Sequence, residues 1–198
     1  MPEFFEVVRR QRACRTFRSD SVGDDLVERV LEAATFAPSA ENAQPWEFVV
    51  VRDESLRARI GDLTRRAWRG GARSHSETRL SPRLLADVDR GAEGDVSAAP
   101  VLIVVCGDGR RAHEAAIPAS IFPAVQNLLL AANAVGLGAA LTTLPTTFAV
   151  ELRELLALPD HVHPLAVVPV GHPARALGPP RREPVSDHAH RDRYGRRW

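Results

Sequence analysis

The segment from Ala119 to Val135 is apolar almost all the way around a helix, and no charged residue interrupts it. Its large apolar side chains are Ile121, Phe122, Val125, Leu128, Leu129 and Leu130. A helix without a polar face has to be covered on every side, which excludes the outer surface of a small monomeric domain. We therefore predict either a central helix or a helix at a subunit interface, ended by the cap Gly136-Leu137-Gly138.

Around this segment, helical patterns alternate with short apolar runs. The runs that predict buried strands are Phe48–Val51, Val101–Cys106, Ala139–Leu144 and Leu165–Val170. Helical periodicity is present at about 4–8, 24–34, 55–63 and 150–158. Val101–Cys106 is continuous and β-branched, as in a strand that is buried on both faces. The order of elements predicts a single α+β domain over residues 1–198, with a sheet covered by helices.

Two segments lack this periodicity. Residues 69–97 are rich in Gly, Ser, Arg and Asp, apart from a short helix near Leu84, Leu85 and Val88. They predict a mobile surface excursion, which is either a lid or a plain loop. Residues 172–198 contain many Pro and Arg residues and predict an extended C-terminal arm.

The charge balance favours no highly charged partner. The net charge is +1, and all 26 basic residues are arginines. We therefore expect neither nucleic acid nor membrane as a partner, and the apolar run around Leu128–Ala132 looks too short for a membrane span. The cysteines Cys14 and Cys106 have no metal or redox spacing, and Met1–Val8 has no signal-peptide pattern. Both features favour a cytoplasmic protein.

Motif spacing excludes several common active sites. No serine lies in a Gly-x-Ser-x-Gly elbow, and the histidines lack the His-Glu-x-x-His spacing of a zinc site, so we predict no metal. Neither Gly-x-Gly-x-x-Gly nor a phosphate loop with Gly-Lys-Ser/Thr occurs. A Rossmann or nucleotide-hydrolysing site is therefore not expected.

The stretch Ala37–Val51 is the most informative part of the chain for a ligand site. Small residues and two amides, Asn42 and Gln44, precede a Pro-Trp pair and an apolar run. The small residues would let a flat ligand approach, and the amides offer donors and acceptors. The pattern also fits a helix end and a turn with a packed Trp46. Two arginine clusters, at 9–18 and 175–197, would form an anion site only if the fold brings them together.

Four motifs in the right order resemble those of the FMN-dependent nitroreductase superfamily over essentially the whole chain. They are Gln11-Arg12-Ala13-Cys14-Arg15-Thr16-Phe17, the loop Ala37–Phe48, the buried helix Gln126–Ala132 leading to Gly136-Leu137-Gly138, and the late pair Arg181-Arg182. The loop matches Ala-Pro-Ser-x-x-Asn-x-Gln-Pro-Trp-x-Phe throughout and is the most specific of the four. The resemblance implies a central, mostly antiparallel sheet flanked by helices, in an intertwined homodimer with two FMN molecules at the interface.

The same resemblance assigns expected FMN contacts. The residues expected to bind the phosphate and the flavin end are Arg12, Ala13, Arg15, Arg181 and Arg182. Those expected to reach the FMN of the partner subunit are Pro38, Ser39, Ala40 and Asn42. Those expected to lie along the ring, with a backbone N–H near flavin N5, are Leu141, Thr142, Thr143 and Leu144. Arg15 is also the candidate that tunes the flavin by stabilising its anionic reduced form.

Gln11 and Ala13 depart from the family pattern, since each removes a donor for the phosphate. The implied activity is a ping-pong transfer of hydride from NAD(P)H through flavin N5 to an electron-poor nitroaromatic or quinone acceptor. No side chain is needed as acid or base. Trp68 and the arginines of 69–97 are candidates for acceptor choice. The alternatives are flavin fragmentation or dehalogenation on the same scaffold, a non-catalytic flavin-binding protein, and a structural dimer without cofactor.

Overall fold

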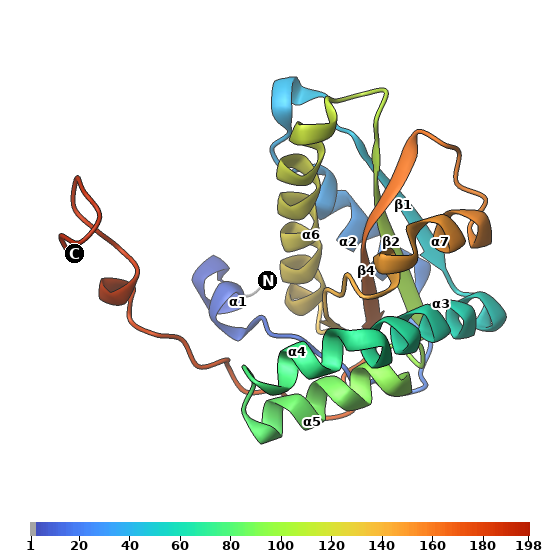
Figure 1. Cartoon of the computed structure of the whole chain (residues 1–198), viewed down its shortest axis with the longest axis horizontal. Helices are drawn as coiled ribbons and strands as arrows, with labels where there is room; N and C mark the ends of the chain where they lie inside the picture. The colour runs from blue at the N-terminus through green and yellow to red at the C-terminus, as the bar shows by residue number, and fades with distance from the viewer. Residues whose placement is uncertain (1–2) are drawn as a thin grey trace.

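A computed structural model describes residues 3–198, and its centre is a four-stranded antiparallel sheet (Figure 1). The strands are β1 (Trp46–Val51), β2 (Val101–Asp108), β3 (Gly138–Ala139) and β4 (Val162–Gly171), and their spatial order is β1-β2-β4-β3. Val104 pairs with Val49 on one side and with Val167 on the other, which defines the register. The predicted α+β class is confirmed.

Helices cover both faces of the sheet. On one face lie α2 (Asp24–Thr35) and α6 (Ile117–Ala134), and on the other lie α3 (Glu54–Ala67) and α7 (Ala149–Leu155). Alternate β2 side chains join two separate cores, with Ile103 in the first and Leu102 in the second. All eight residues of β2 are buried for this reason, so the continuous apolar run correctly predicted a strand covered on both faces.

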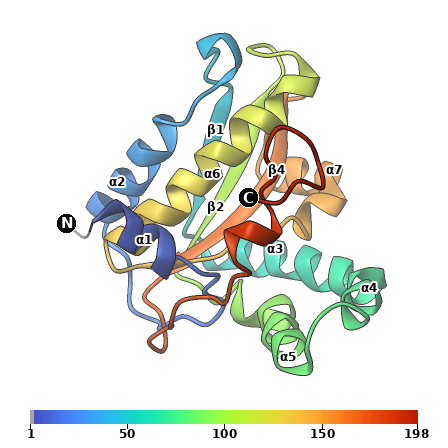
Figure 2. The same ribbon diagram turned by 90° about the vertical axis from the view of Figure 1, so that its left-hand side faces the viewer.

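Helix α6 is not covered on every side within one chain. One face packs against the sheet and α2, whereas Phe122 on the opposite side is 39% exposed. Figure 2 shows α6 crossing an open face of the molecule, with α1 (Phe4–Arg10) beside its C-terminal end. Within one chain α6 is therefore not the fully covered central helix that was the first alternative, and its place at a subunit interface stays a prediction.

Segment Glu114–Ala134 is long and apolar enough to cross a membrane, by length and composition alone, so the expectation that it is too short was wrong. Within its apolar stretch of 18 residues, 44% is buried inside the fold. Buried Ile121, Val125 and Leu128 contact the sheet and α2, as expected of the core helix of a globular domain.

Residues 69–97 are mainly helical. They contain α4 (Arg73–Glu77) and α5 (Pro82–Arg90), flanked by π-type turns at Trp68–Ala72 and Gly91–Asp95. The short helix expected near Leu84 is α5, but the weak periodicity concealed α4. Trp68 is buried and donates from Nε1 to Asp89 Oδ1 at 2.8 Å, so its candidacy as a pocket residue is not supported. The mobility of the segment remains a prediction.

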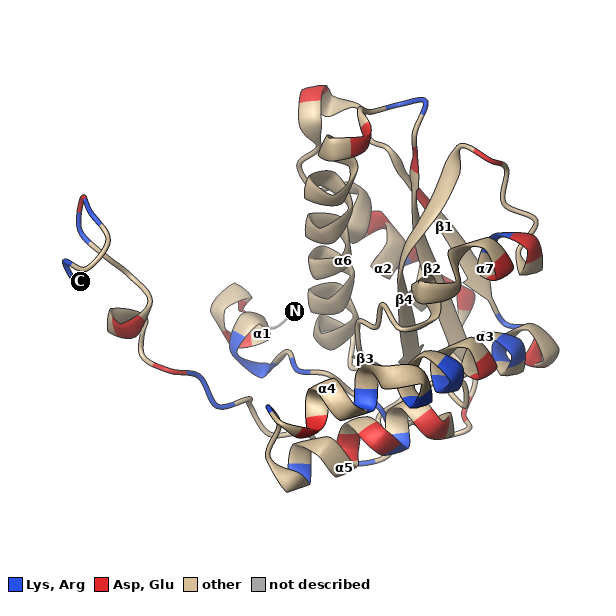
Figure 3. Ribbon diagram, in the orientation of Figure 1, with Lys and Arg blue, Asp and Glu red and all other residues tan. Residues whose placement is uncertain are grey.

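The C-terminal arm leaves the sheet after β4, passes below α1 and extends away from the body (Figure 1). Its exposed apolar side chains include Val185, Tyr194 and Trp198, the last two being 93% and 67% exposed. Figure 3 shows basic residues spaced along the arm, whereas α6 carries no charge. The remaining short turns are 3-10 helices at Ala40–Asn42, Glu114–Ala116, Pro145–Phe148 and Val185–Asp187.

Candidate functional site

The segment that follows α1 lies between β3 and the start of the C-terminal arm. Cys14 N donates to Ala139 O at 2.9 Å, and Ala13 forms a parallel bridge with Ala139. Arg12 Nη1 donates to the carbonyl oxygen of Gly178 at 3.0 Å. The fold therefore brings the N-terminal arginine segment against the beginning of the C-terminal one, which was the condition set for an anion site.

A pocket of about 400 Å³ opens at this junction. Its basic lining residues are Arg10, Arg12 and Arg175, and the backbone of Gly136–Ala139 forms another part of its wall. Within residues 3–198, the only ion pairs that these arginines form are Arg10 with exposed Glu6 at 2.8 Å and Arg175 with Asp87 at 3.7 Å. Three guanidinium groups around one opening make it suitable for an anion.

Gly138 allows the close approach that forms this pocket. A Cβ at Gly138 would lie 2.6 Å from Cys14 Sγ and 2.7 Å from Cys14 Cβ, distances that side chains do not tolerate. Gly136 has φ of +81°, in the left-handed region that ends α6. The predicted cap 136–138 is thus both a helix end and a wall of the pocket.

Arg15 lies outside the lining of this pocket and is held by α5. Its Nη1 donates to Asp87 Oδ2 at 2.9 Å, and the two side chains are 24% and 23% exposed. Asp87 had not been singled out in the sequence, because an aspartate within a polar helical segment has no distinguishing spacing.

The turn 141–144 follows β3 at the edge of the sheet. Thr142 exchanges two backbone hydrogen bonds with Val167, at 3.0 and 2.9 Å, so the predicted strand 139–144 reduces to β3 and one bridge. Leu144 N donates to Thr142 Oγ1 at 3.2 Å. Within residues 3–198 the N–H groups of Leu141 and Thr143 have no such acceptor, so the turn can offer either of them to a ligand.

The loop 38–44 has an unusual, tightly constrained backbone. Glu41, Asn42 and Gln44 all have φ between 49° and 56°, a left-handed conformation that non-glycine residues seldom adopt. Ser39 Oγ accepts from Gln44 N at 3.0 Å, and Ala40 N donates to Ser120 Oγ on α6 at 3.2 Å. Strained backbone that is held by such contacts is typical of ligand-binding loops. Ser120 was not predicted, although a buried serine in an apolar helix is a signal that could have been used.

The predicted cofactor residues form two groups at opposite ends of α6. Ser120, which holds the loop 38–44, is near the start of the helix, and Asn133, which lines the arginine pocket, is near its end. The rise between them is about 20 Å, at ~1.5 Å per residue. Figure 1 shows the loop and α1 well separated along α6. One chain therefore does not bring the two groups around one ligand.

Arg181 and Arg182 lie on the exposed arm beyond Gly178. The Nη1 of Arg182 donates to the carbonyl oxygen of Arg181 at 3.0 Å, and neither side chain lines the arginine pocket. Arg175, nearer to β4, takes the position in the pocket that the sequence had suggested for these two. The sequence could have predicted this role for Arg175, because it belongs to the second arginine cluster.

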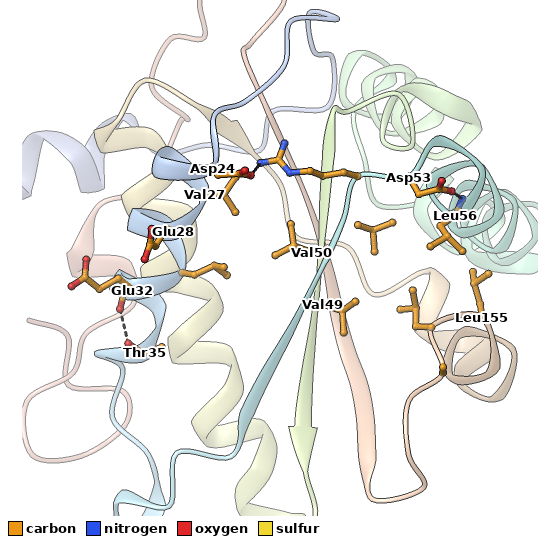
Figure 4. Close-up of a pocket in the computed structure, with 15 residues that line it drawn as sticks. Asp24, Val27, Glu28, Glu32, Thr35, Val49, Val50, Asp53, Leu56 and Leu155 are labelled. Atoms are coloured by element: carbon orange, nitrogen blue, oxygen red, sulfur yellow. Dashed lines mark hydrogen bonds and ion pairs between the residues drawn. The ribbon is translucent and has the colours of Figure 1, made fainter.

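A larger groove, of about 940 Å³, lies elsewhere, beside the unpaired edge of β1 (Figure 4). Val49 and Val50 form its floor between α2 on one side and α3 with α7 on the other. The acidic residues lining it are Asp24, Glu28, Glu32 and Asp53. None of the predicted cofactor residues lines this groove.

The buried thiols are shielded from ionisation. Burial is the main cause that raises the pKa of Cys14, and it raises the pKa of Cys106 to about 12, with a smaller contribution from the charge of Glu47. In the part of the chain that the structure describes, no group of three or more His, Cys, Asp or Glu side chains could hold a metal ion.

The model of the nitroreductase family matches residues 8–172. This chain belongs to the nitroreductase family. It is therefore identified as an oxidoreductase, and its helix-flanked antiparallel sheet is the nitroreductase fold.

Individual relatives agree with this placement. A protein of Methanothermobacter thermautotrophicus named as an NADH dehydrogenase/NAD(P)H nitroreductase is 30% identical over 89% of this chain and 80% of its own length. Iodotyrosine deiodinase 1 of Mus musculus is 29% identical over 87% of this chain, which spans only 63% of that protein. A solved structure described as a nitroreductase from Desulfovibrio desulfuricans in complex with FMN has a TM-score of 0.73 and 27% identity, with 98% of this chain and 99% of the other covered.

Proposed function

We propose that this nitroreductase-family protein is a homodimer with two FMN sites, each built from both subunits, and that it passes hydride from NAD(P)H to a small electron-poor acceptor. The observation that carries the proposal is the separation of the two groups of predicted cofactor residues along α6. Two antiparallel copies of α6 would place the loop 38–44 of one subunit beside the arginine pocket of the other.

The residues present suit FMN. Arg10, Arg12 and Arg175 surround an opening with more positive than negative charge, as a phosphate requires. The missing hydroxyl at Ala13 and the missing guanidinium at Gln11 are offset by Arg175, and by Arg181 and Arg182 if the arm folds back. The Thr143 N–H is free to donate to a ring nitrogen, and Leu141 and Leu144 provide apolar contact beside it.

FMN, when bound, supplies the redox chemistry by accepting hydride at N5 and returning it to the acceptor. The protein holds the phosphate with its arginines, orients the ring with the 141–144 turn, and covers it with the loop 38–44 of the partner subunit. Asn42 and Ser39 would offer that ring an amide and a hydroxyl. No side chain has to donate or remove a proton, which agrees with the absence of a catalytic motif in the sequence.

The exposed apolar surface supports the dimer. Helix α1, whose Phe4 and Phe5 are 64% and 63% exposed, packs beside α6, whose Phe122 is 39% exposed, and Figure 2 shows the two helices on the same side of the molecule. Large apolar side chains grouped on one face of a small domain are typical of protein interfaces. A second copy would cover the side of α6 that the sequence predicts to be buried.

The arm and the β1 groove are complementary in charge, which supports an intertwined arrangement. The groove has an apolar floor and an acidic border, including Glu28 and Glu32. The arm is basic and carries Tyr194 and Trp198 in exposed positions (Figure 3). We propose that the arm of one subunit docks in this groove of the other, beside the unpaired edge of β1.

The reaction can be tested by reconstitution. We expect the protein with FMN to absorb as a flavoprotein, to be bleached by NADH or NADPH under nitrogen, and to oxidise either nucleotide steadily with a quinone or nitrofurazone. A protein that stays colourless after FMN is added would contradict the proposal. Binding without turnover would favour the non-catalytic alternative. Free, buried thiols agree with the proposed cytoplasmic location.

Reductive dehalogenation is the second candidate, because several relatives are iodotyrosine deiodinases. In that reaction two electrons and a proton replace a carbon–iodine bond with carbon–hydrogen, and iodide leaves. Iodide release from 3-iodotyrosine with NAD(P)H, measured beside quinone turnover, distinguishes the two activities.

Light scattering tests the assembly. The double variant Glu28→Lys with Glu32→Lys should weaken the dimer by charge repulsion with the arm, whereas Glu154→Lys, on α7 outside the groove, should not. Equal dimer stability in the two variants would exclude arm docking at this groove.

A further inference from the structure

Asp87 on α5 joins three segments that are distant in sequence. Its carboxylate accepts from Arg15 at 2.9 Å and from Arg90 at 3.3 Å, and it lies 3.7 Å from Arg175. Arg15 belongs to the N-terminal segment and Arg175 to the start of the arm, whereas Arg90 lies on α5 itself. The carboxylate is therefore the point at which α5 is attached to both parts of the arginine region.

The contact also includes the side-chain stem of Arg15. A Cβ at Gly91, at the end of α5, would lie 2.9 Å from Arg15 Cδ and 3.3 Å from Arg15 Cβ. Helix α5 thus packs on the aliphatic part of Arg15 with Gly91 and holds the guanidinium with Asp87. Because head and stem are both held, the direction of the Arg15 side chain depends on α5.

The α4–α5 pair has glycine-containing turns at both ends. The π-type turns Trp68–Ala72 and Gly91–Asp95 flank it, and Gly71 has φ of +140°. Such turns interrupt the regular helix at each end of the pair. The Asp87 ion pairs are therefore a tie between a segment with such turns and the region expected to hold the flavin.

The electrostatics of the cluster follow from its composition. One carboxylate faces three guanidinium groups, so the cluster keeps a positive excess while Asp87 reduces the field of Arg15. Both side chains of the Arg15–Asp87 pair are less than one-third exposed, so water screens this pair less than a surface pair.

We propose that Asp87 is the positioning residue for Arg15, which lies outside the lining of the arginine pocket but shares Asp87 with the pocket residue Arg175. In this proposal Asp87 ties the α4–α5 helices to the proposed FMN site and sets how strongly Arg15 stabilises negative charge there. The inference rests on the proposed FMN site. With α5 docked, Arg15 is oriented and partly neutralised. Loss of the Asp87 charge leaves Arg15 more positive, which favours the reduced, more negative cofactor.

The reduction potential of bound FMN provides one test. Asp87→Asn should raise the ratio of reduced to oxidised FMN at a fixed ambient potential by about tenfold, because Arg15 is then no longer oriented and partly neutralised by the carboxylate. The same substitution in an Arg15→Gln background should have little effect. Asp89→Asn is the matched control, because Asp89 is on the same helix but pairs with Trp68 and Arg73, and it should leave the ratio unchanged.

Hydrogen exchange in the FMN-free protein tests the tie independently of the cofactor. Asp87→Asn and Arg15→Gln should each reduce protection of the α5 amides by about tenfold, as expected when a charged hydrogen bond is lost. The double variant should lose no more than either single one. Asp89→Asn should reduce protection too, but its effect should add to that of Arg15→Gln.

These results separate the two proposals. Failure of FMN to bind overturns the proposed function, and the exchange cycle still decides whether Asp87 holds Arg15. Additive effects of Asp87→Asn and Arg15→Gln on exchange would overturn the tie. The positioning role would be overturned if Asp87 and Arg15 are coupled in exchange but Asp87→Asn does not shift the FMN potential. It would also be overturned if Asp87→Asn shifts that potential equally in the Arg15→Gln background.

Discussion

Arg12 and Gly178 are 166 residues apart in sequence, yet Arg12 Nη1 donates to the Gly178 carbonyl oxygen at 3.0 Å. This contact holds the segment after α1 against the beginning of the arm, where Arg175 lines the same pocket. The sequence did not show whether the two arginine clusters lie close together, and this contact places them side by side. The anion site proposed here depends on that junction.

Replacing Arg12 should weaken FMN binding. Arg12→Gln removes a guanidinium from the pocket and the tie to Gly178, and we expect the dissociation constant to rise roughly 10- to 100-fold, as for a hydrogen bond to a charged group. Arg9→Gln, on α1 outside the pocket lining, is the control and should change the constant little. Fluorescence titration of the FMN-free protein measures both. Equal affinities of the two variants for FMN would show that Arg12 does not bind the phosphate.

A methyl group at Gly138 should destabilise the pocket wall. Gly138→Ala puts Cβ 2.6 Å from Cys14 Sγ, and relief of that contact requires movement of the backbone. We expect a loss of about 1–3 kcal/mol in the free energy of unfolding. Gly178→Ala is the matched control, since nothing lies within 4 Å of its Cβ position. Urea denaturation of the two variants gives the comparison, and a stable Gly138→Ala protein would show that the approach of Cys14 is not tight.

Removal of the Ser120 hydroxyl should loosen the loop 38–44. Ser120 is buried and accepts from Ala40 N, so Ser120→Ala leaves that N–H without its acceptor and should cost about 1–2 kcal/mol of stability. Thr146→Ala removes a more exposed hydroxyl bond to Thr143 O and should cost less. Hydrogen exchange of residues 39–44 should increase in the first variant only. Unchanged exchange there would mean that other contacts hold the left-handed backbone.

The stability of the protein should fall at high pH through Cys106. Burial raises the pKa of its thiol from 9.0 to about 12, so between these values the thiol ionises in the unfolded chain but not in the folded one. The contribution of the neutral, buried thiol to the free energy of unfolding is fully present below pH 9. It is lost as pH rises towards 12, by roughly 1.4 kcal/mol per pH unit.

Cys106→Ala provides the comparison for this pH dependence. Between pH 8 and 10.5 the wild type should lose about 2 kcal/mol more unfolding free energy than the variant, which lacks the thiol. Chemical denaturation at both pH values measures the difference. Parallel losses in the two proteins would show that the Cys106 thiol does not titrate differently in the folded and unfolded states.

The sequence by itself determined the local features that depend on near neighbours. The β-branched run Val101–Cys106 predicted a strand covered on both faces, because every side chain in it is apolar. The order of the motifs predicted the nitroreductase family, and the Gly136–Gly138 cap predicted the end of α6. Apolar patterns and helix caps depend on residues that are close in sequence, so they can be predicted from the sequence alone.

Only the tertiary structure decided which distant residues meet. The Asp87–Arg15 pair joins residues 72 apart, and nothing in the polar segment 69–97 distinguished Asp87 from its neighbours. In the structure Arg175, and not the predicted Arg181, lines the pocket. One face of α6 is exposed, although its sequence predicts burial. The physical reason is that packing of whole helices and strands sets these contacts, and charge pairs over such separations leave no periodic trace in the chain.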